Sequence, residues 1–151
     1  MKIGILSDTH GLLRPEVLDA LQGCDVILHG GDINKHSVLD RLAEIAPVKV
    51  VRGNNDKEWA EAVPDSLDFT LGSMRVYMTH KKKDLPEDLS DYDLAIVGHT
   101  HKYAQSEING TIVLNPGSCG PRRFDLPITL AVAELDGKTI SINRIDIPHQ
   151  K

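Results

Sequence analysis

The most informative part of this chain is the stretch Lys2-Ile3-Gly4-Ile5-Leu6-Ser7-Asp8-Thr9-His10-Gly11. Its first half is an apolar run of strand length, and its second half carries a carboxylate and an imidazole, Asp8 and His10. A strand that only fills a core does not need this ending. Because ligand sites in open α/β sheets gather at the carboxyl ends of strands, we expect Asp8 and His10 to belong to such a site.

Four further apolar runs end in the same way. They are residues 26–31 before Asp32, 48–53 before Asn54, 76–79 before His80, and 94–98 before His99 and His101. Seven side chains are therefore candidate metal ligands: Asp8, His10, Asp32, Asn54, His80, His99 and His101. Seven ligands are more than one tetrahedral ion requires, and they suit two neighbouring divalent ions that share a carboxylate.

The pattern of apolar residues predicts a change of architecture near residue 65. Before it, helical periodicity over residues 12–23 and 34–46 separates apolar runs, which predicts parallel strands with right-handed crossovers. After it, turn signals such as Asn109-Gly110 and Asp136-Gly137 separate short strands. We expect these strands at 68–71, 75–79, 93–97, 104–108, 111–114, 128–135 and 139–145. The prediction is one domain over residues 1–151, an α/β fold of two packed sheets with helices outside.

Composition limits the classes of function. With 151 residues, 40% hydrophobic and 26% charged, the chain has the composition of a soluble globular protein. No apolar run approaches the roughly 20 residues of a membrane span, and Met1 leads straight into the first strand, so we expect a cytoplasmic protein without membrane contact. We expect Cys24 and Cys119 to be reduced. The net charge of −5 argues against broad nucleic-acid binding, so an anionic substrate would need the metals.

The donor types indicate both the metals and the reaction. Carboxylates mixed with imidazoles and one amide suit manganese, iron, zinc, cobalt or nickel better than calcium or magnesium. The donor types do not distinguish among these five metals, of which manganese is our first expectation. Two divalent ions with the carboxylates of Asp8 and Asp32 leave a charge of about +2, which attracts a phosphate ester. A hydroxide bridging the ions would attack phosphorus in line while the ions polarise the non-bridging oxygens.

Spacing within the motifs supports one shared cluster, although each motif alone is weak. In an extended chain, residues two apart share a face, so Asp8 can point with His10, and His99 with His101. A single Asp-x-His is more often a cap with a surface histidine, and residues 53–56 alone are most simply a turn. Found together in this order, the motifs favour a metal centre.

The ordered motifs resemble those of the calcineurin-like metallophosphoesterases, and more narrowly of their small YfcE-type phosphodiesterases. They are Asp8-Thr9-His10, Gly31-Asp32, Gly53-Asn54-Asn55-Asp56, Thr79-His80, Gly98-His99-Thr100-His101, Asn115-Pro116-Gly117-Ser118 and Pro121-Arg122. The resemblance implies a four-layer αββα sandwich of two mixed β-sheets flanked by helices. It also implies two metal sites that share Asp32, one completed by Asp8, His10 and His101, the other by Asn54, His80 and His99.

Two positions depart from the family pattern. Many relatives have histidine where this chain has Asn55, and that histidine is thought to help the leaving group depart. A neutral amide cannot be a general acid, so we expect slow turnover of esters with poor leaving groups. The second departure is Lys81, which follows His80 where the family usually has glycine.

The remaining polar residues give weaker predictions. We assign catalytic positions to Asn54, Asn55 and His80, and Arg122 is a weak candidate for binding the substrate phosphate, against the alternative of a surface arginine. We interpret Lys81-Lys82-Lys83 as a solvated face rather than a nucleotide-binding patch. His29 is predicted to be a buried histidine that is not a ligand, and His36 and His149 to lie on the surface.

Three functions fit the sequence. The first is a two-metal phosphodiesterase acting on a small phosphodiester, with nucleotide-like esters among the candidates. The second is a phosphomonoesterase that uses the same metal pair. The third is a non-catalytic protein-binding scaffold, because a retromer subunit resembles this fold yet serves mainly as an interaction surface. Self-association into a homo-oligomer is left open.

Overall fold

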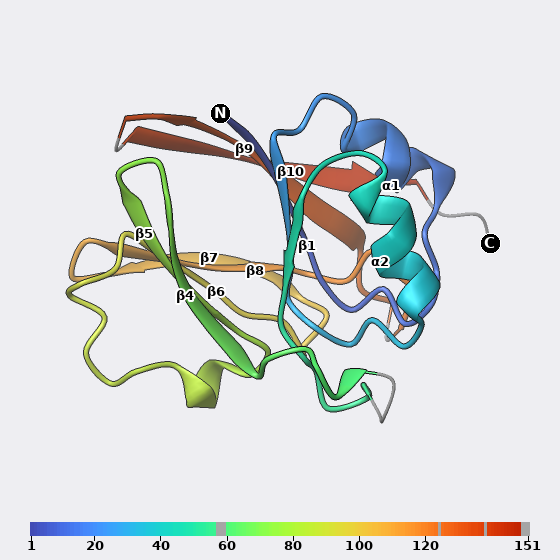
Figure 1. Ribbon diagram of the computed structural model, residues 1–151, viewed down its shortest axis with the longest axis horizontal. Coiled ribbons are helices and arrows are strands. Elements are labelled where there is room, and N and C mark those ends of the chain that lie inside the picture. Colours follow the sequence, from blue (N-terminus) through green and yellow to red (C-terminus); the bar gives the residue numbers. More distant parts are fainter. Residues whose placement is uncertain (57–59, 124, 138, 149–151) are drawn as a thin grey trace.

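Two five-stranded β-sheets pack face to face in the computed structural model (Figure 1), which describes residues 1–56, 60–123, 125–137 and 139–148. The first sheet has the order β10-β9-β1-β2-β3 and comprises β1 (Lys2–Leu6), β2 (Val26–His29), β3 (Val48–Val50), β9 (Ile128–Asp136) and β10 (Thr139–Ile147). The second has the order β4-β5-β6-β8-β7 and comprises β4 (Ser66–Leu71), β5 (Met74–Thr79), β6 (Leu94–Ile96), β7 (Tyr103–Ile108) and β8 (Thr111–Pro116). His149 lies outside the described residues.

The strand pattern confirms the predicted change of architecture. β1, β2 and β3 pair in parallel, and they are connected by α1 (Pro15–Ala20) and α2 (His36–Ala43). After residue 65, each predicted strand is present, with its ends shifted by at most two residues. Both helices are shorter than predicted. One cause is Asn34, whose φ of 69° is left-handed and therefore cannot belong to the start of a right-handed helix.

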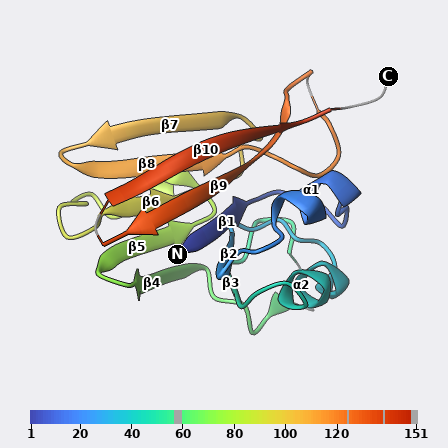
Figure 2. The same cartoon turned by 90° about the horizontal axis from the view of Figure 1, so that it is seen from above.

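The alternation of side chains along β1 connects the two cores of the molecule. Ile3 and Ile5 point toward the second sheet and join the core between the sheets, whereas Leu6 packs with Val17 of α1 and Leu42 of α2. α1 and α2 accordingly cover the side of the first sheet that faces away from the second sheet (Figure 2). The helices thus form one outer layer of the sandwich.

The outer face of the second sheet is covered differently. Ala95 and Val113 on that face pack against Leu89, with Leu85 and Tyr92 beside them. These covering residues belong to the segment after β5, which contains the 3₁₀ turn η2 (Lys82–Asp84). The predicted α/β sandwich of two mixed sheets is therefore confirmed, and its fourth layer is a loop with a 3₁₀ turn. No helix in the described part of the chain is long and apolar enough to cross a membrane.

The loops that follow β1, β2, β3, β5 and β6 meet at one end of the sandwich (Figure 1). Backbone hydrogen bonds connect them: Asp8 N donates to Gly31 O at 2.9 Å, His10 N to Asp32 O at 3.0 Å, and Gly98 N to His80 O at 2.8 Å. These bonds join the loop after β1 to the loop after β2, and the loop after β6 to the loop after β5.

Candidate metal centre

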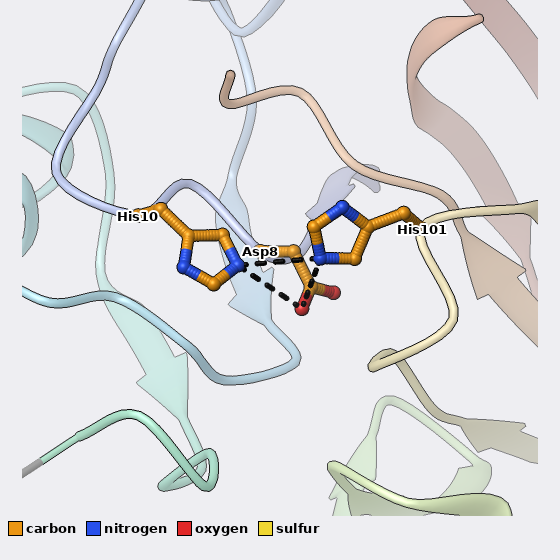
Figure 3. A group of neighbouring side chains, drawn as sticks. All are labelled: Asp8, His10 and His101. Atoms are coloured by element: carbon orange, nitrogen blue, oxygen red, sulfur yellow. Dashed lines mark hydrogen bonds and ion pairs between the residues drawn. The ribbon is translucent and has the colours of Figure 1, made fainter. Parts of the chain in front are cut away.

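The predicted ligands gather in two neighbouring groups at this end of the sandwich. Asp8, His10 and His101 place one ligand atom each within 4.8 Å of one another, and so do Asp32, His80 and His99. Figure 3 shows the first group, in which both imidazole rings point toward the carboxylate of Asp8. Asn54 joins the second group, because its Oδ1 lies 3.2 Å from Nδ1 of His99. All seven predicted ligands are thus brought together.

The carboxylate of Asp32 lies between the two groups. Its Oδ2 is 3.7 Å from Nε2 of His10 in the first group and 3.2 Å from Nε2 of His80 in the second. The Oδ1 of Asp8 lies 3.4 Å from Nε2 of His101 and 3.8 Å from Nε2 of both His10 and His80. Ligand atoms held about 2.1 Å from one ion are separated by roughly 3.0–3.4 Å. The separations of 3.2 and 3.4 Å match this range, and those of 3.7 and 3.8 Å are slightly longer.

The backbone reaches this arrangement by a route that the sequence analysis did not expect. We expected Asp8 with His10, and His99 with His101, to share a face in an extended chain, and this expectation is wrong. All four residues have left-handed φ angles, of 56°, 46°, 77° and 64° respectively. Left-handed φ angles are unfavourable for residues other than glycine. They recur at functional sites, where surrounding contacts hold the backbone in this conformation.

Asp8 is held with one oxygen satisfied and the other free. Its Oδ2 accepts hydrogen bonds from Ser7 Oγ at 2.7 Å and from the backbone N of His99 at 3.1 Å. Its buried Oδ1 has no hydrogen-bond partner among the described residues. Leaving a buried carboxylate oxygen unsatisfied is costly, and a cation at this position would remove the cost.

The buried Nε2 of His80 also has no hydrogen-bond partner among the described residues. Its Nδ1 lies 2.7 Å from the carbonyl oxygen of Gly30, which can only accept, so Nδ1 carries the proton. In the neutral imidazole, the lone pair of Nε2 then faces the carboxylate oxygens of Asp32 and Asp8 at 3.2 and 3.8 Å. A lone pair directed at carboxylate oxygens requires a proton or a metal cation between them.

The charges at the site favour cations. Burial opposes the ionised form of Asp8, but the neighbouring imidazoles of His10 and His101, the charge of His80 and the hydrogen bond from Ser7 hold the pKa of its carboxyl far below the ordinary value. Burial likewise opposes the protonated form of His80, yet Asp32 and Asp8 raise the pKa of this imidazole. The two carboxylates therefore remain ionised and create a field that attracts positive charge.

Asn55 lies against the shared carboxylate. Its backbone N donates to Asp32 Oδ1 at 2.8 Å, and its side-chain Nδ2 donates to Asp32 Oδ2 at 3.3 Å. The amide at this family-variable position thus orients a ligand. The prediction that it does not act as a general acid follows from its chemistry and stays a prediction.

Asp56 holds the second group together, and the sequence analysis did not single it out. Its buried carboxylate accepts three backbone hydrogen bonds, from Ile33 at 2.9 Å, Asn34 at 2.8 Å and Gly53 at 2.9 Å. Gly53 lets the loops approach, because a Cβ there would lie 2.2 Å from both N and Oδ1 of Asp32. Apart from the position of Asp56 in the motif 53–56, the sequence gives no sign of this role.

The end of β8 and the residues that follow it fasten the first group. Asn115 Nδ2 donates to the carbonyl oxygen of Gly98 at 3.0 Å, and Ser118 Oγ donates to the carbonyl oxygen of Asp8 at 2.9 Å. Both residues belong to a motif that the sequence analysis quoted without giving it a role. The structure shows that they connect two ligand loops.

Three predictions on the other polar residues have different outcomes. His29 is fully buried, Gly31 N donates to its Nδ1, and its Nε2 lies 3.0 Å from Thr9 Oγ1, which confirms a satisfied histidine outside the ligand set. Burial lowers its pKa to about 4. His36 is exposed, as predicted. Arg122 donates to the carbonyl oxygens of Leu126 and Asp125 in its own loop, so it is not brought into the ligand cluster.

A cleft of about 440 Å³ opens beside the second group. It is lined by Arg52, Gly53, Asn54, Asp65, Ser66, Tyr77, Thr79, His80, Lys81, Lys83 and Asp84. Lys82 and Lys83 are exposed, as the interpretation of a solvated face requires, but Lys81 is only half-exposed. Burial lowers the pKa of His99, and the charges of His80 and Lys81 lower it further.

A sandwich of two mixed sheets with clustered aspartates and histidines at the strand ends is the architecture of a metal-dependent phosphoesterase. The model of the calcineurin-like phosphoesterase superfamily domain matches residues 1–138, and the chain belongs to this superfamily. A protein of Methanothermobacter thermautotrophicus named "probable metallophosphoesterase" is 34% identical, with 93% of this chain and 89% of the relative covered.

Two further comparisons bear on function and fold. A phosphodiesterase of Methanocaldococcus jannaschii is 28% identical, with 91% of this chain and 95% of the relative covered. The crystal structure of Vps29 from Entamoeba histolytica in complex with zinc has a TM-score of 0.76 at 23% identity, with 97% of this chain and 99% of that chain covered. The Vps29 likeness concerns the fold alone.

Proposed function

We propose that this protein is a metal-dependent phosphodiesterase that hydrolyses small phosphodiesters with two divalent transition-metal ions, manganese first among them. The observation that carries the proposal is the convergence of Asp8 Oδ1, Asp32 Oδ2 and the Nε2 atoms of His10, His80 and His101 within 3.2–3.8 Å of neighbouring members of the set. A relative that is named a phosphodiesterase supports a diester, rather than a monoester, as the substrate.

The ligand sets follow from the two groups. One ion would be held by Asp8, His10, His101 and Asp32, and the other by the shared Asp32 with Asn54, His80 and His99. When bound, such ions polarise phosphoryl oxygens and make water a nucleophile near neutral pH.

The residues of the chain keep the ligands in the form that binds metal. Gly30 O holds the proton of His80 on Nδ1, so Nε2 is free to bind. Ser7 and the backbone of His99 occupy Oδ2 of Asp8 and leave Oδ1 available. Asn55 orients Asp32 through both of its donors. Because Asn55 cannot give a proton to a departing alkoxide, esters with good leaving groups are the preferred substrates.

Turnover of bis(p-nitrophenyl) phosphate by the manganese-loaded protein tests the proposal, with p-nitrophenyl phosphate as the paired monoester. We expect a higher kcat/KM for the diester. The reverse order would establish the phosphomonoesterase, and hydrolysis of neither ester by protein that has bound metal would favour the binding scaffold. The cytoplasmic location stays a prediction.

A further inference from the structure

The cleft beside the second ligand group is basic in an otherwise acidic protein. Three cationic side chains, Arg52, Lys81 and Lys83, line it together with two carboxylates, Asp65 and Asp84, whereas the whole chain has a net charge of −5. A cleft with locally positive charge concentrates anionic ligands.

The cleft continues from the proposed reaction centre. Asn54 and His80 lie in its lining, so a substrate phosphate at the second ligand group would sit at its mouth. Its volume of about 440 Å³ lies within the roughly 300–1,000 Å³ typical of small-molecule sites and exceeds what one phosphate fills. The loop after β3, the start of β4 and the end of β5 with the residues after it line the cleft, and they lie at the same end of the molecule (Figure 1).

The two lysines of the cleft are available to a ligand. Within residues 1–56, 60–123, 125–137 and 139–148, neither Lys81 nor Lys83 has an ion-pair or hydrogen-bond partner for its ammonium group, whereas Arg52 donates from Nε to the carbonyl oxygen of Asp56 at 3.1 Å. Lys82 between them does not line the cleft. Alternate lysines of this run therefore differ in role.

We propose that this cleft binds a second phosphate group of the substrate. The preferred substrate is then a phosphodiester in which one of the two esterified groups carries an additional phosphate. The inference rests on the proposed phosphodiesterase function, since it places the reacting phosphate at the metal centre. Lys81 and Lys83 would provide charge-assisted hydrogen bonds to the added phosphate, with Arg52 contributing positive charge.

Calorimetric titration of the manganese-loaded protein with thymidine 3′,5′-bisphosphate and with thymidine 5′-monophosphate tests the binding directly. We expect the bisphosphate to bind about tenfold more tightly, the gain that one charge-assisted hydrogen bond typically gives. Lys83→Gln and Lys81→Gln should each reduce this preference at least about threefold. Lys82→Gln is the matched control and should leave it unchanged.

Turnover of the p-nitrophenyl esters of the same two nucleotides at the 5′-phosphate gives the second measurement. The ester with the 3′-phosphate should show the higher kcat/KM, with the same response to the three variants. Equal affinities for the two nucleotides, or a preference that both cleft variants retain, would overturn the inference. Failure to release p-nitrophenol from either ester, with the binding preference intact, would contradict the proposed function alone.

Discussion

The two ligand groups differ in their access to solvent. In the first group, the side chains of Asp8, His10 and His101 are 0%, 4% and 8% exposed, and the loops that carry them are fastened by Ser7, Asn115 and Ser118. In the second group, Asp32 and His80 are buried, but Asn54 and His99 are exposed, and Asn54 lines the basic cleft. One group is enclosed and pre-formed, and the other is open on the side from which a substrate can arrive.

Under the proposed function, this difference would separate ion retention from substrate binding. Enclosed ligands, whose unsatisfied atoms are costly, hold a cation firmly. Open ligands leave room for a substrate phosphate, at the expense of weaker retention of the ion. If this division holds, a change to Asp32, which lies between the groups, should disturb both of them, and a change to a ligand of the open group should disturb that group alone.

Asp32→Asn is expected to have the largest effect. It removes a charge from both proposed sites, and because even the partners of metal ligands affect activity 10–100-fold, kcat/KM for bis(p-nitrophenyl) phosphate should fall by more than about 100-fold. Metal analysis by mass spectrometry should show losses at both sites. Asp40→Asn, which changes an exposed carboxylate of α2, is the control. Retention of two ions by Asp32→Asn would show that Asp32 is not shared.

His99→Ala and Asn54→Ala should affect only the open group. We expect each variant to retain one ion of two and to lose most of its activity, on the order of 100-fold. Because both side chains are exposed, the melting temperature of the chelated protein should change little. Unchanged activity in both variants would remove these residues from the site.

The pH dependence of stability tests the packing beneath the ligand loops, through His29. Burial holds the pKa of His29 near 4 in the folded protein, below 6.5 for the free side chain, so the unfolded chain takes up the proton first. The contribution of neutral His29 to the free energy of unfolding is complete above pH 6.5. It is lost as the pH falls toward 4, and the total loss is about 3 kcal/mol.

Urea denaturation of the chelated protein at pH 7 and pH 4.5 measures this loss. The decrease in unfolding free energy between the two pH values should be smaller in His29→Gln than in the parent chain. His36→Gln, at an exposed histidine, should behave like the parent. An identical decrease in all three proteins would contradict the buried, neutral state of His29.

Gly53→Ala is expected to lower the free energy of unfolding by about 2 kcal/mol, as is typical for an overpacked site. A Cβ at this position would meet Asp32 at 2.2 Å, so the open group should bind its ion more weakly. Gly110→Ala, where a Cβ would meet no atom within 4 Å, should leave metal affinity unchanged. Denaturation and manganese titration of the two variants provide the comparison.

The sequence predicted the elements that depend on local patterns. The observed strand ends differ from the predicted ends by at most two residues. The reason is that burial on one or both faces of a strand leaves a pattern of apolar residues in the sequence, as in residues 128–135. The helices were predicted too long, since the left-handed φ of Asn34 depends on bonds from the backbone of Ile33 and Asn34 to Asp56, 22–23 residues away. Propensity does not report such distant contacts.

The ligand set was predicted, but the way in which it is held was not. Ordered motifs located Asp8, Asp32 and His80, whereas the left-handed backbone at Asp8 follows from its hydrogen bond to Gly31 in another loop. The positions of Lys81 and Lys82 also differ through tertiary placement alone, since Lys81 lines the cleft and Lys82 does not. Three consecutive lysines look equivalent in the sequence, and only the fold determines which of them line the cleft.

The central claim is that loops from five strands hold a pair of cations at one end of the sandwich. Anomalous diffraction from a manganese-soaked crystal tests it most directly. The account predicts two peaks, one among Asp8, His10 and His101 and one among Asp32, His80 and His99, with Asp32 in contact with both. Absence of density at these residues, or a single peak outside them, would contradict the claim.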